Sequence, residues 1–267
     1  METTGRSGVA WKAVALPAEH GGWGFLAEPV VLGLVLAPSA AGLCLALAAL
    51  AAFLARHPLR LALIDRRKRA RYPRTALAER VFAAYATAAL ALAAAAFALA
   101  PLPFWRPLAV AAPVGLAALA FDARGRSREA FPEAAGAVAL GASAAAIALA
   151  GGAPAAFAWG AWALLALRAV TSVLYVRARI RLDRGLPAGP RAVHAGHAAA
   201  LAAATGLASV GWAPWLAAVV FSVLLARSGW GLSRWRRPVR PQTLGFQELS
   251  YGLVTVTLLV IGYRARL

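Results

Sequence analysis

Cysteine, lysine and acidic residues are scarce in this chain, and the scarcity excludes several classes of protein. Cys44 is the single cysteine among 267 residues, so neither a disulfide framework nor a cysteine metal site is available. Lys12 and Lys68 are the only lysines, and 10 Asp and Glu face 28 Lys and Arg, which gives a formal net charge of +18. Disorder is excluded as well, because 61% of the residues are hydrophobic and the mean hydropathy is +0.68.

Apolar residues and arginine dominate what is present. An excess of positive charge alone would suggest nucleic-acid binding. In so apolar a chain it is typical of a membrane protein whose basic loops lie in the cytoplasm. We therefore expect membrane lipids as partners and no nucleic acid.

The apolar residues gather in runs that are long enough to cross a hydrocarbon core about 30 Å thick as helices. The sequence predicts an all-α polytopic membrane protein with about nine transmembrane helices. It is expected to form a single transmembrane domain over residues 1–267, with a short cytoplasmic tail over 1–15. The predicted spans are roughly 22–38, 40–56, 79–100, 106–121, 132–151, 154–175, 195–211, 214–229 and 244–263.

Positive charge alternates between the two sides of these spans. With the N-terminus placed in the cytoplasm, 25 of the 28 Lys and Arg residues fall on the cytoplasmic side. Only Arg106, Arg264 and Arg266 fall on the other side. Cytoplasmic loops are rich in Lys and Arg, and no cleavable signal peptide precedes the first span. We expect a multi-pass protein of the inner (plasma) membrane with its N-terminus inside and its C-terminus outside.

Most of the acids lie on or near the cytoplasmic half of this topology. A charge at membrane depth is costly, so it usually faces a cavity or a partner. The pattern predicts one polar cavity that opens to the cytoplasm; the alternative is that helix-end acids neutralise nearby arginines. The acids concerned are Glu19, Glu28, Asp65, Asp122, Glu129, Glu133, Asp183 and Glu248.

A cavity rich in arginine suits a phosphate, a diphosphate or an anionic lipid headgroup, because a guanidinium fork pairs with two oxygens at once. Basic loops that hold the topology and attract anionic lipids are the structural alternative. Glu19 and His20 are the candidates for acid–base chemistry. Arg60, Arg74, Arg177 and Arg179 are predicted to hold the phosphate. Further ligand-binding candidates are Glu28, His57, Arg128, Glu133, Tyr175, Gln247 and Glu248.

Several short motifs resemble the YwiC-like bacterial membrane proteins, a family of unassigned biochemistry. The motifs are Pro17-Ala18-Glu19-His20-Gly21-Gly22-Trp23-Gly24, Glu28-Pro29, His57-Pro58-Leu59-Arg60, Arg71-Tyr72-Pro73-Arg74-Thr75, Tyr175-Val176-Arg177 and Arg240-Pro241-Gln242-Thr243. This resemblance extends over the whole chain and supports a membrane protein.

A more distant resemblance is to the UbiA-type prenyltransferases, which are nine-helix enzymes that join a prenyl diphosphate to an aromatic acceptor with magnesium. The resemblance implies a UbiA-like bundle with Asp-rich motifs after the second and sixth spans. Here the motif positions are occupied by His57, Leu61 and Asp65, and by Tyr175, Arg179 and Asp183. Each motif keeps only its last acid. Asp65 and Asp183 would orient the arginines or bind any remaining magnesium, but two carboxylates beside an arginine disfavour this cation.

Three functions are compatible with the sequence. The leading hypothesis is a protein that binds an isoprenoid or lipid phosphate and, if it is an enzyme, transfers a prenyl or lipid-phosphate group. A transporter or channel that uses Glu28, Glu133 and Glu248 is the second. A structural membrane subunit without a ligand is the third.

Overall fold

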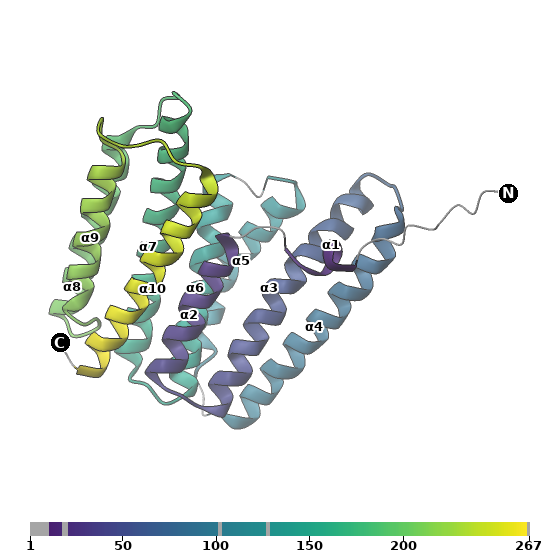
Figure 1. Ribbon diagram of the computed structural model, residues 1–267. Coiled ribbons are helices and arrows are strands. Elements are labelled where there is room, and N and C mark those ends of the chain that lie inside the picture. Colours follow the sequence, from purple (N-terminus) through teal and green to yellow (C-terminus); the bar gives the residue numbers. More distant parts are fainter. Residues whose placement is uncertain (1–10, 18–20, 101–102, 127–128, 266–267) are drawn as a thin grey trace.

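The computed structural model describes residues 11–17, 21–100, 103–126 and 129–265, and these residues form helices without strands (Figure 1). The helices are α1 (Trp11–Ala15), α2 (Gly21–Leu36), α3 (Ala40–Arg67), α4 (Pro73–Leu99), α5 (Arg106–Ala123), α6 (Ala130–Ala150), α7 (Ala155–Asp183), α8 (Pro190–Ser209), α9 (Leu216–Gly231) and α10 (Pro241–Ala265). Each of the predicted spans corresponds to one helix from α2 to α10, which confirms the all-helical fold class.

Six of these helices, namely α3, α4, α5, α6, α7 and α10, are long and apolar enough to cross a membrane. Two shorter apolar segments, Gly22–Leu36 in α2 and Leu216–Gly231 in α9, add to them. Helix α8 belongs to neither group among the described residues, and Arg191, His194 and His197 account for its lower hydropathy. The chain is therefore an integral membrane protein with several helical spans.

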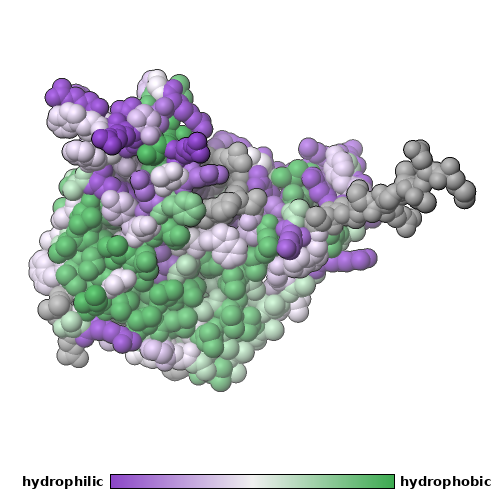
Figure 2. All heavy atoms as spheres, in the orientation of Figure 1, coloured by the Kyte–Doolittle hydropathy of each residue, from purple (hydrophilic) through white to green (hydrophobic). Residues whose placement is uncertain are grey.

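Successive long helices run in opposite directions, so the connections alternate between the two ends of the bundle (Figure 1). The α3–α4, α5–α6, α7–α8 and α9–α10 connections lie at one end, which we call the polar end. Hydrophilic side chains cover this end, and hydrophobic side chains cover the middle of the bundle on the face shown in Figure 2. The basic segments of the sequence thus gather on one side of the predicted membrane.

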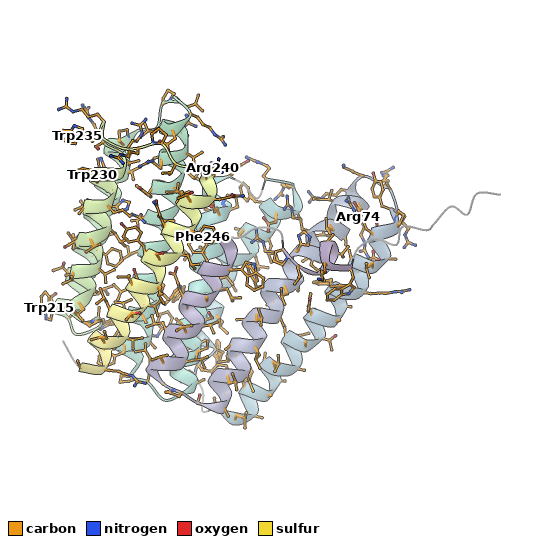
Figure 3. The ribbon with its side chains drawn as sticks, viewed as in Figure 1. Arg74, Trp215, Trp230, Trp235, Arg240 and Phe246 are labelled. Atoms are coloured by element: carbon orange, nitrogen blue, oxygen red, sulfur yellow. The ribbon has the colours of Figure 1, made fainter. Side chains whose placement is uncertain are left out.

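Tryptophans lie near both ends of the apolar part, where indole rings favour the lipid–water interface. Trp230 and Trp235 lie at the polar end together with Arg240, whereas Trp215 lies toward the opposite end (Figure 3). All three tryptophans are exposed. Their placement agrees with an interfacial position for these side chains.

Helix α6 lies at the centre and packs against α2, α3, α5 and α7. Its segment 143–148 is buried and consists of serine, alanine and isoleucine. Small residues let membrane helices approach closely. A Cβ on Gly33 of α2 would lie 2.8 Å from the backbone oxygen of Ala144, so the absence of a side chain brings α2 against α6.

Two helices continue beyond the predicted spans. Helix α3 ends at Arg67 rather than near residue 56, and α7 ends at Asp183 rather than near 175. The thickness of the bilayer limits the apolar segment and not the helix, which can continue into the aqueous side. Helix α1 lies within the predicted tail and packs against α3 and α4, with Val14 and Ala15 buried.

Candidate functional site

The predicted site residues that the structure describes lie in several separate groups in the half of the bundle nearer the polar end. Glu19, His20 and Arg128 fall outside the described residues. Glu28, Tyr175 and Glu248 come together inside the bundle. Asp65 with Arg74, Asp183 with Arg179, and Glu133 with Arg177 form three further pairs, and His57 and Arg60 line a pocket. The described contacts do not join these groups into one shared cavity.

The innermost group is an ion pair between helices that are far apart in sequence. Arg168 of α7 is buried, with 2% of its side chain exposed, and its Nη2 lies 3.2 Å from Oε1 of Glu28 in α2. The same Nη2 donates a hydrogen bond of 2.9 Å to the backbone oxygen of Glu248 in α10. One guanidinium group therefore joins α2, α7 and α10.

The carboxylate of Glu248 has its own partners. Nη1 of Arg227 in α9 donates to Oε1, and the hydroxyl of Ser172 donates to Oε2. We call Glu28, Arg168, Ser172, Arg227 and Glu248 the buried charge cluster. Its two carboxylates and two guanidinium groups balance in charge, which a buried group of charges requires.

Aromatic rings complete this cluster. The guanidinium carbon of Arg227 lies 4.1 Å from the ring centroid of Tyr175 and 4.8 Å from that of Tyr251. Such cation–π contacts are worth about 2 kcal/mol when they are desolvated. Tyr175, predicted to bind a ligand, thus contacts a buried cation here.

Two buried donors in the cluster have no hydrogen-bond partner among the described residues. They are the Nε–H groups of Arg168 and Arg227. A buried donor without an acceptor costs about 1–3 kcal/mol, and buried water commonly satisfies such groups. A water molecule or another small acceptor beside either group would remove this cost.

The close approach of α10 to α2 depends on Gly252. A Cβ at this position would lie against Oε1 of Glu28 and within 2.9 Å of Nη2 of Arg168. We expect Gly252→Ala to lower the free energy of unfolding by about 1–3 kcal/mol, because overpacking forces the buried ion pair apart. Thermal unfolding in detergent measures the change. Gly245→Ala on the same helix, where a Cβ would meet open space, is the control and should leave stability unchanged or raise it by up to about 1 kcal/mol, because alanine favours a helix.

Asp65 and Arg74 join the ends of α3 and α4. The two carboxylate oxygens of Asp65 accept hydrogen bonds from Nη2 (2.8 Å) and Nε (3.3 Å) of Arg74, and Oδ2 also accepts one from the hydroxyl of Thr75 (2.8 Å). The side chain of Asp65 is 0% exposed, whereas that of Arg74 is 43% exposed. This group closes the turn between the two helices.

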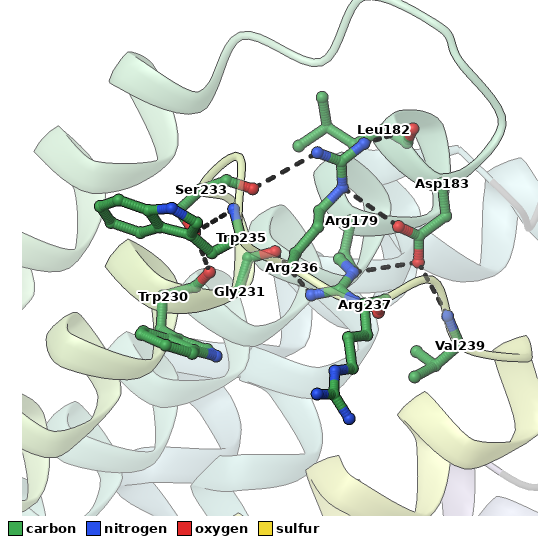
Figure 4. Close-up of polar contacts among 10 residues, drawn as sticks. All are labelled: Arg179, Leu182, Asp183, Trp230, Gly231, Ser233, Trp235, Arg236, Arg237 and Val239. Atoms are coloured by element: carbon green, nitrogen blue, oxygen red, sulfur yellow. Dashed lines mark hydrogen bonds and ion pairs between the residues drawn. The ribbon is translucent and has the colours of Figure 1, made fainter.

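Asp183 and Arg179 hold the connection between α9 and α10 (Figure 4). Nε of Arg179 donates to Asp183 at 3.0 Å, and its two terminal nitrogens donate to the backbone oxygens of Gly231 and Arg237. Arg236 also binds the Asp183 carboxylate, at 3.2 Å. Each of the three nitrogens of the Arg179 fork donates to a partner within the protein, which leaves two N–H groups, one on each terminal nitrogen, for any further acceptor.

The last pair lies near the surface. Arg177 and Glu133 link α7 to α6 at 3.3 Å, and each side chain is 40% exposed. Gln247 is exposed on α10. The ion pair is distinct from those of the buried charge cluster, which join α2 to α7 and α9 to α10.

A pocket lies between the start of α2 and α3. It is lined by Pro17, Gly22, Phe53, Arg56, His57 and Arg60. Its volume is about 20 Å³, room for about one water molecule. Arg56 binds the buried carboxylate of Asp122 in α5, and the ring nitrogen Nε2 of His57 lies 3.1 Å from the backbone oxygen of Ala13 in α1.

The residues that the UbiA-type resemblance assigns to magnesium do not fit this cation. Asp65 and Asp183 lie in two separate groups, on α3 and α7, and both carboxylates accept from arginine. Within the described ranges, no group of three His, Cys, Asp or Glu side chains is placed to hold a metal ion. We therefore derive no chemistry through magnesium.

Sequence reasoning missed Arg168, Ser172 and Arg227 as site residues, because it counted the two arginines with the basic loops. For Arg168, the sequence does contain an indication of this role. Arg168 lies well inside the predicted span 154–175, and an intramembrane arginine indicates a buried acidic partner. Which acid it pairs with depends on the packing of α2 against α7.

Comparison with known proteins supports one of the two resemblances. Residues 16–148 match the model of the YwiC-like protein family. No curated protein and no solved structure gives a significant match, so the UbiA-like fold stays a prediction. The match covers the pocket and the Asp65 group, and it includes Glu28 but not Arg168, Arg227 or Glu248. The YwiC-like part of this integral membrane protein is therefore residues 16–148.

Proposed function

We propose that this membrane protein binds the phosphate or diphosphate group of an isoprenoid or another lipid in the pocket between α2 and α3. The observation that carries the proposal is the lining of the pocket, where Arg56, His57 and Arg60 face the start of α2. Free N–H groups at a helix start favour an anion, and arginine forks bind phosphate oxygens.

The position of the pocket suits a lipid ligand. It lies beside the start of α2 and the middle of α3, where basic side chains meet the apolar part of the bundle, and Phe53 adds an apolar wall. A volume of about 20 Å³ is too small for a phosphate, so binding requires Arg60 or His57 to rotate outward.

This proposal narrows the predicted set of phosphate ligands. Arg60 and His57 stay in it, and Arg56, whose fork pairs with Asp122, adds positive charge to the wall of the pocket. Arg179 leaves it because its fork binds Asp183 and two backbone oxygens. Glu19 and His20 directly precede α2 in the sequence, so they remain the candidates for acid–base chemistry. Prenyl or lipid-phosphate transfer is the reaction class that such a site would serve.

The polar end is proposed to face the cytoplasm of the inner membrane, with the C-terminus outside. The basic loops gathered at this end support the assignment, because positive charge favours the cytoplasmic side.

Thermal unfolding of the purified protein tests headgroup binding. We expect farnesyl diphosphate to stabilise the protein without added magnesium, by about 2.7 kcal/mol when its concentration is a hundred times Kd. Arg60→Gln should abolish this stabilisation, because it removes a guanidinium group from the pocket. Arg66→Gln is the matched control, since Arg66 lies on the same helix in an exposed pair with Glu79.

The ligand panel separates the sources of the phosphate. Inorganic pyrophosphate tests the charged group alone, farnesol tests the chain alone, and phosphatidylglycerol tests an ordinary membrane lipid. Stabilisation by farnesol equal to that by the diphosphate would contradict a phosphate site. Equal stabilisation of Arg60→Gln and Arg66→Gln by farnesyl diphosphate would also contradict a phosphate site in this pocket.

Transport is the second candidate, and the burial of Glu28 and Glu248 around Arg168 favours it. Glu133 is a weaker member of such a path, since it is exposed and pairs with Arg177. Uptake of a solute into vesicles, with no response to any diphosphate, would favour transport.

A structural subunit without a ligand is the third candidate. It would be the better description if substitution of Arg177 and Arg179 changed only the expression or the orientation of the protein.

A further inference from the structure

The two carboxylates of the buried charge cluster differ in how well they are satisfied. Both oxygens of Glu248 accept hydrogen bonds, from Arg227 and from Ser172. Glu28 has one ion-pair partner among the described residues, Arg168, and the nitrogen that binds it also donates to the backbone oxygen of Glu248. A buried carboxylate with a single shared donor is the member of the cluster that is least stabilised as an anion.

The surroundings of Glu28 supply few other charges. Helix α2 packs against α3, α6, α7 and α10. The charged groups that act on Glu28 are Arg168 from α7, which attracts it, and Glu248 from α10, which repels it. The part of α6 that packs in the centre presents serine, alanine and isoleucine. The ionised form of Glu28 therefore depends on Arg168.

A route from the polar end to Glu28 is compatible with the local structure. A side chain on a helix leans toward the preceding turn, which here holds Gly24 and brings the Glu28 carboxyl group toward the polar end. A Cβ on Gly24 would meet Cδ1 of Leu249 at 3.6 Å and Oε1 of Glu28 at 3.9 Å, so Gly24 leaves only a narrow gap, and 10% of the Glu28 side chain is exposed. Water bound to the unpartnered Nε–H groups of Arg168 and Arg227 would extend a hydrogen-bonded path into the cluster.

We propose that Glu28 is a proton-binding site inside the bundle and that Arg168 is the counter-charge that responds to it. A proton from water binds a carboxylate oxygen of Glu28, and the ion pair becomes a neutral hydrogen bond. Arg168 then keeps its bond to the Glu248 backbone and turns toward the Glu248 carboxylate, which stays ionised. Protonation thereby loosens the link between α2 and α7, so that proton binding is coupled to helix packing. This inference goes beyond headgroup binding and does not depend on it.

Infrared difference spectroscopy of the purified protein during a pH titration tests this proposal directly. We expect a carboxyl C=O band that grows on acidification, shifts in D₂O and is lost in Glu28→Gln. The band should persist unchanged in Glu133→Gln, which removes an exposed acid outside the cluster. In Glu248→Gln it should appear only at lower pH, because Glu28 is then the one carboxylate of the cluster beside two guanidinium groups. A titration of Glu28→Gln that matches that of the original protein would overturn the proposal.

A second variant keeps the test decisive if Glu28→Gln does not fold. Glu28→Asp retains a carboxyl group in a new position, so the band should move in frequency or in midpoint. An unchanged band in Glu28→Asp would overturn the proposal. Farnesyl diphosphate binding by the same variants reports on the pocket separately, so failure of one proposal can be distinguished from failure of the other.

Discussion

Replacing Arg168 by methionine is expected to destabilise the protein by about 3–5 kcal/mol, the usual cost of breaking a buried ion pair by removing one partner. Methionine keeps much of the volume but leaves Glu28 without its ion-pair partner. The loss should shrink at acidic pH, where protonation neutralises Glu28. Unfolding in detergent micelles, followed by tryptophan fluorescence at several pH values, measures it.

A double variant isolates the charge as the cause. Glu28→Gln in the Arg168→Met background removes the unpaired carboxylate and should recover a large part of the lost stability. Arg177→Met is the matched control on the same helix, because the exposed pair of Arg177 and Glu133 is worth about 0–1 kcal/mol. If Arg168→Met and Arg177→Met lower the free energy of unfolding equally, the ion pair of Arg168 and Glu28 does not stabilise the protein more than the exposed pair does.

Asp65→Asn is expected to have the next largest effect, a loss of about 2–3 kcal/mol. Asparagine keeps the shape, but it replaces an oxygen acceptor by a donor that faces Arg74 or Thr75. Hydrogen bonds to charged groups contribute about 1.5–3 kcal/mol each, and Asp65 is 0% exposed. The melting temperature in detergent measures the loss.

Helices α3 and α4 offer a second ion pair as the control for Asp65. Glu79 binds Arg66 at 2.8 Å across the same two helices, with 32% of the Glu79 side chain exposed. Glu79→Gln should cost about 0–1 kcal/mol, because solvent screens the pair. Equal losses in the two variants would mean that burial does not set the strength of the Asp65 group.

Much of the fold could be predicted from local patterns. The apolar runs located the helices from α2 to α10, and the alternation of arginine located the polar end. The predicted ends were less accurate for α3 and α7, because these helices continue past their apolar parts on Arg, Leu and Ala, which favour helix. Helix α8, which corresponds to the predicted span 195–211, is not among the described helices that are long and apolar enough to cross a membrane.

The candidate site was less predictable. Asp65 and Asp183 were singled out by motif position, yet each one lies in its own group and accepts from arginine. Arg179 is a predicted phosphate ligand, and in the structure it holds the α9–α10 connection through the backbone oxygens of Gly231 and Arg237. An arginine fork satisfies any nearby acceptor, so its sequence position alone does not distinguish a ligand-binding role from a structural one.

The sequence by itself determined that this chain is a helical membrane protein with one strongly basic side, because hydropathy and charge are properties of short segments. Only the tertiary structure decided which charges meet: Glu28 with Arg168, Arg227 with Glu248, and Arg56 with Asp122. The physical reason is that each pair joins two different helices, and two of the pairs join helices that are not consecutive, α2 with α7 and α3 with α5. Their partners are selected by close packing of small residues such as Gly33 and Gly252, and not by spacing along the sequence.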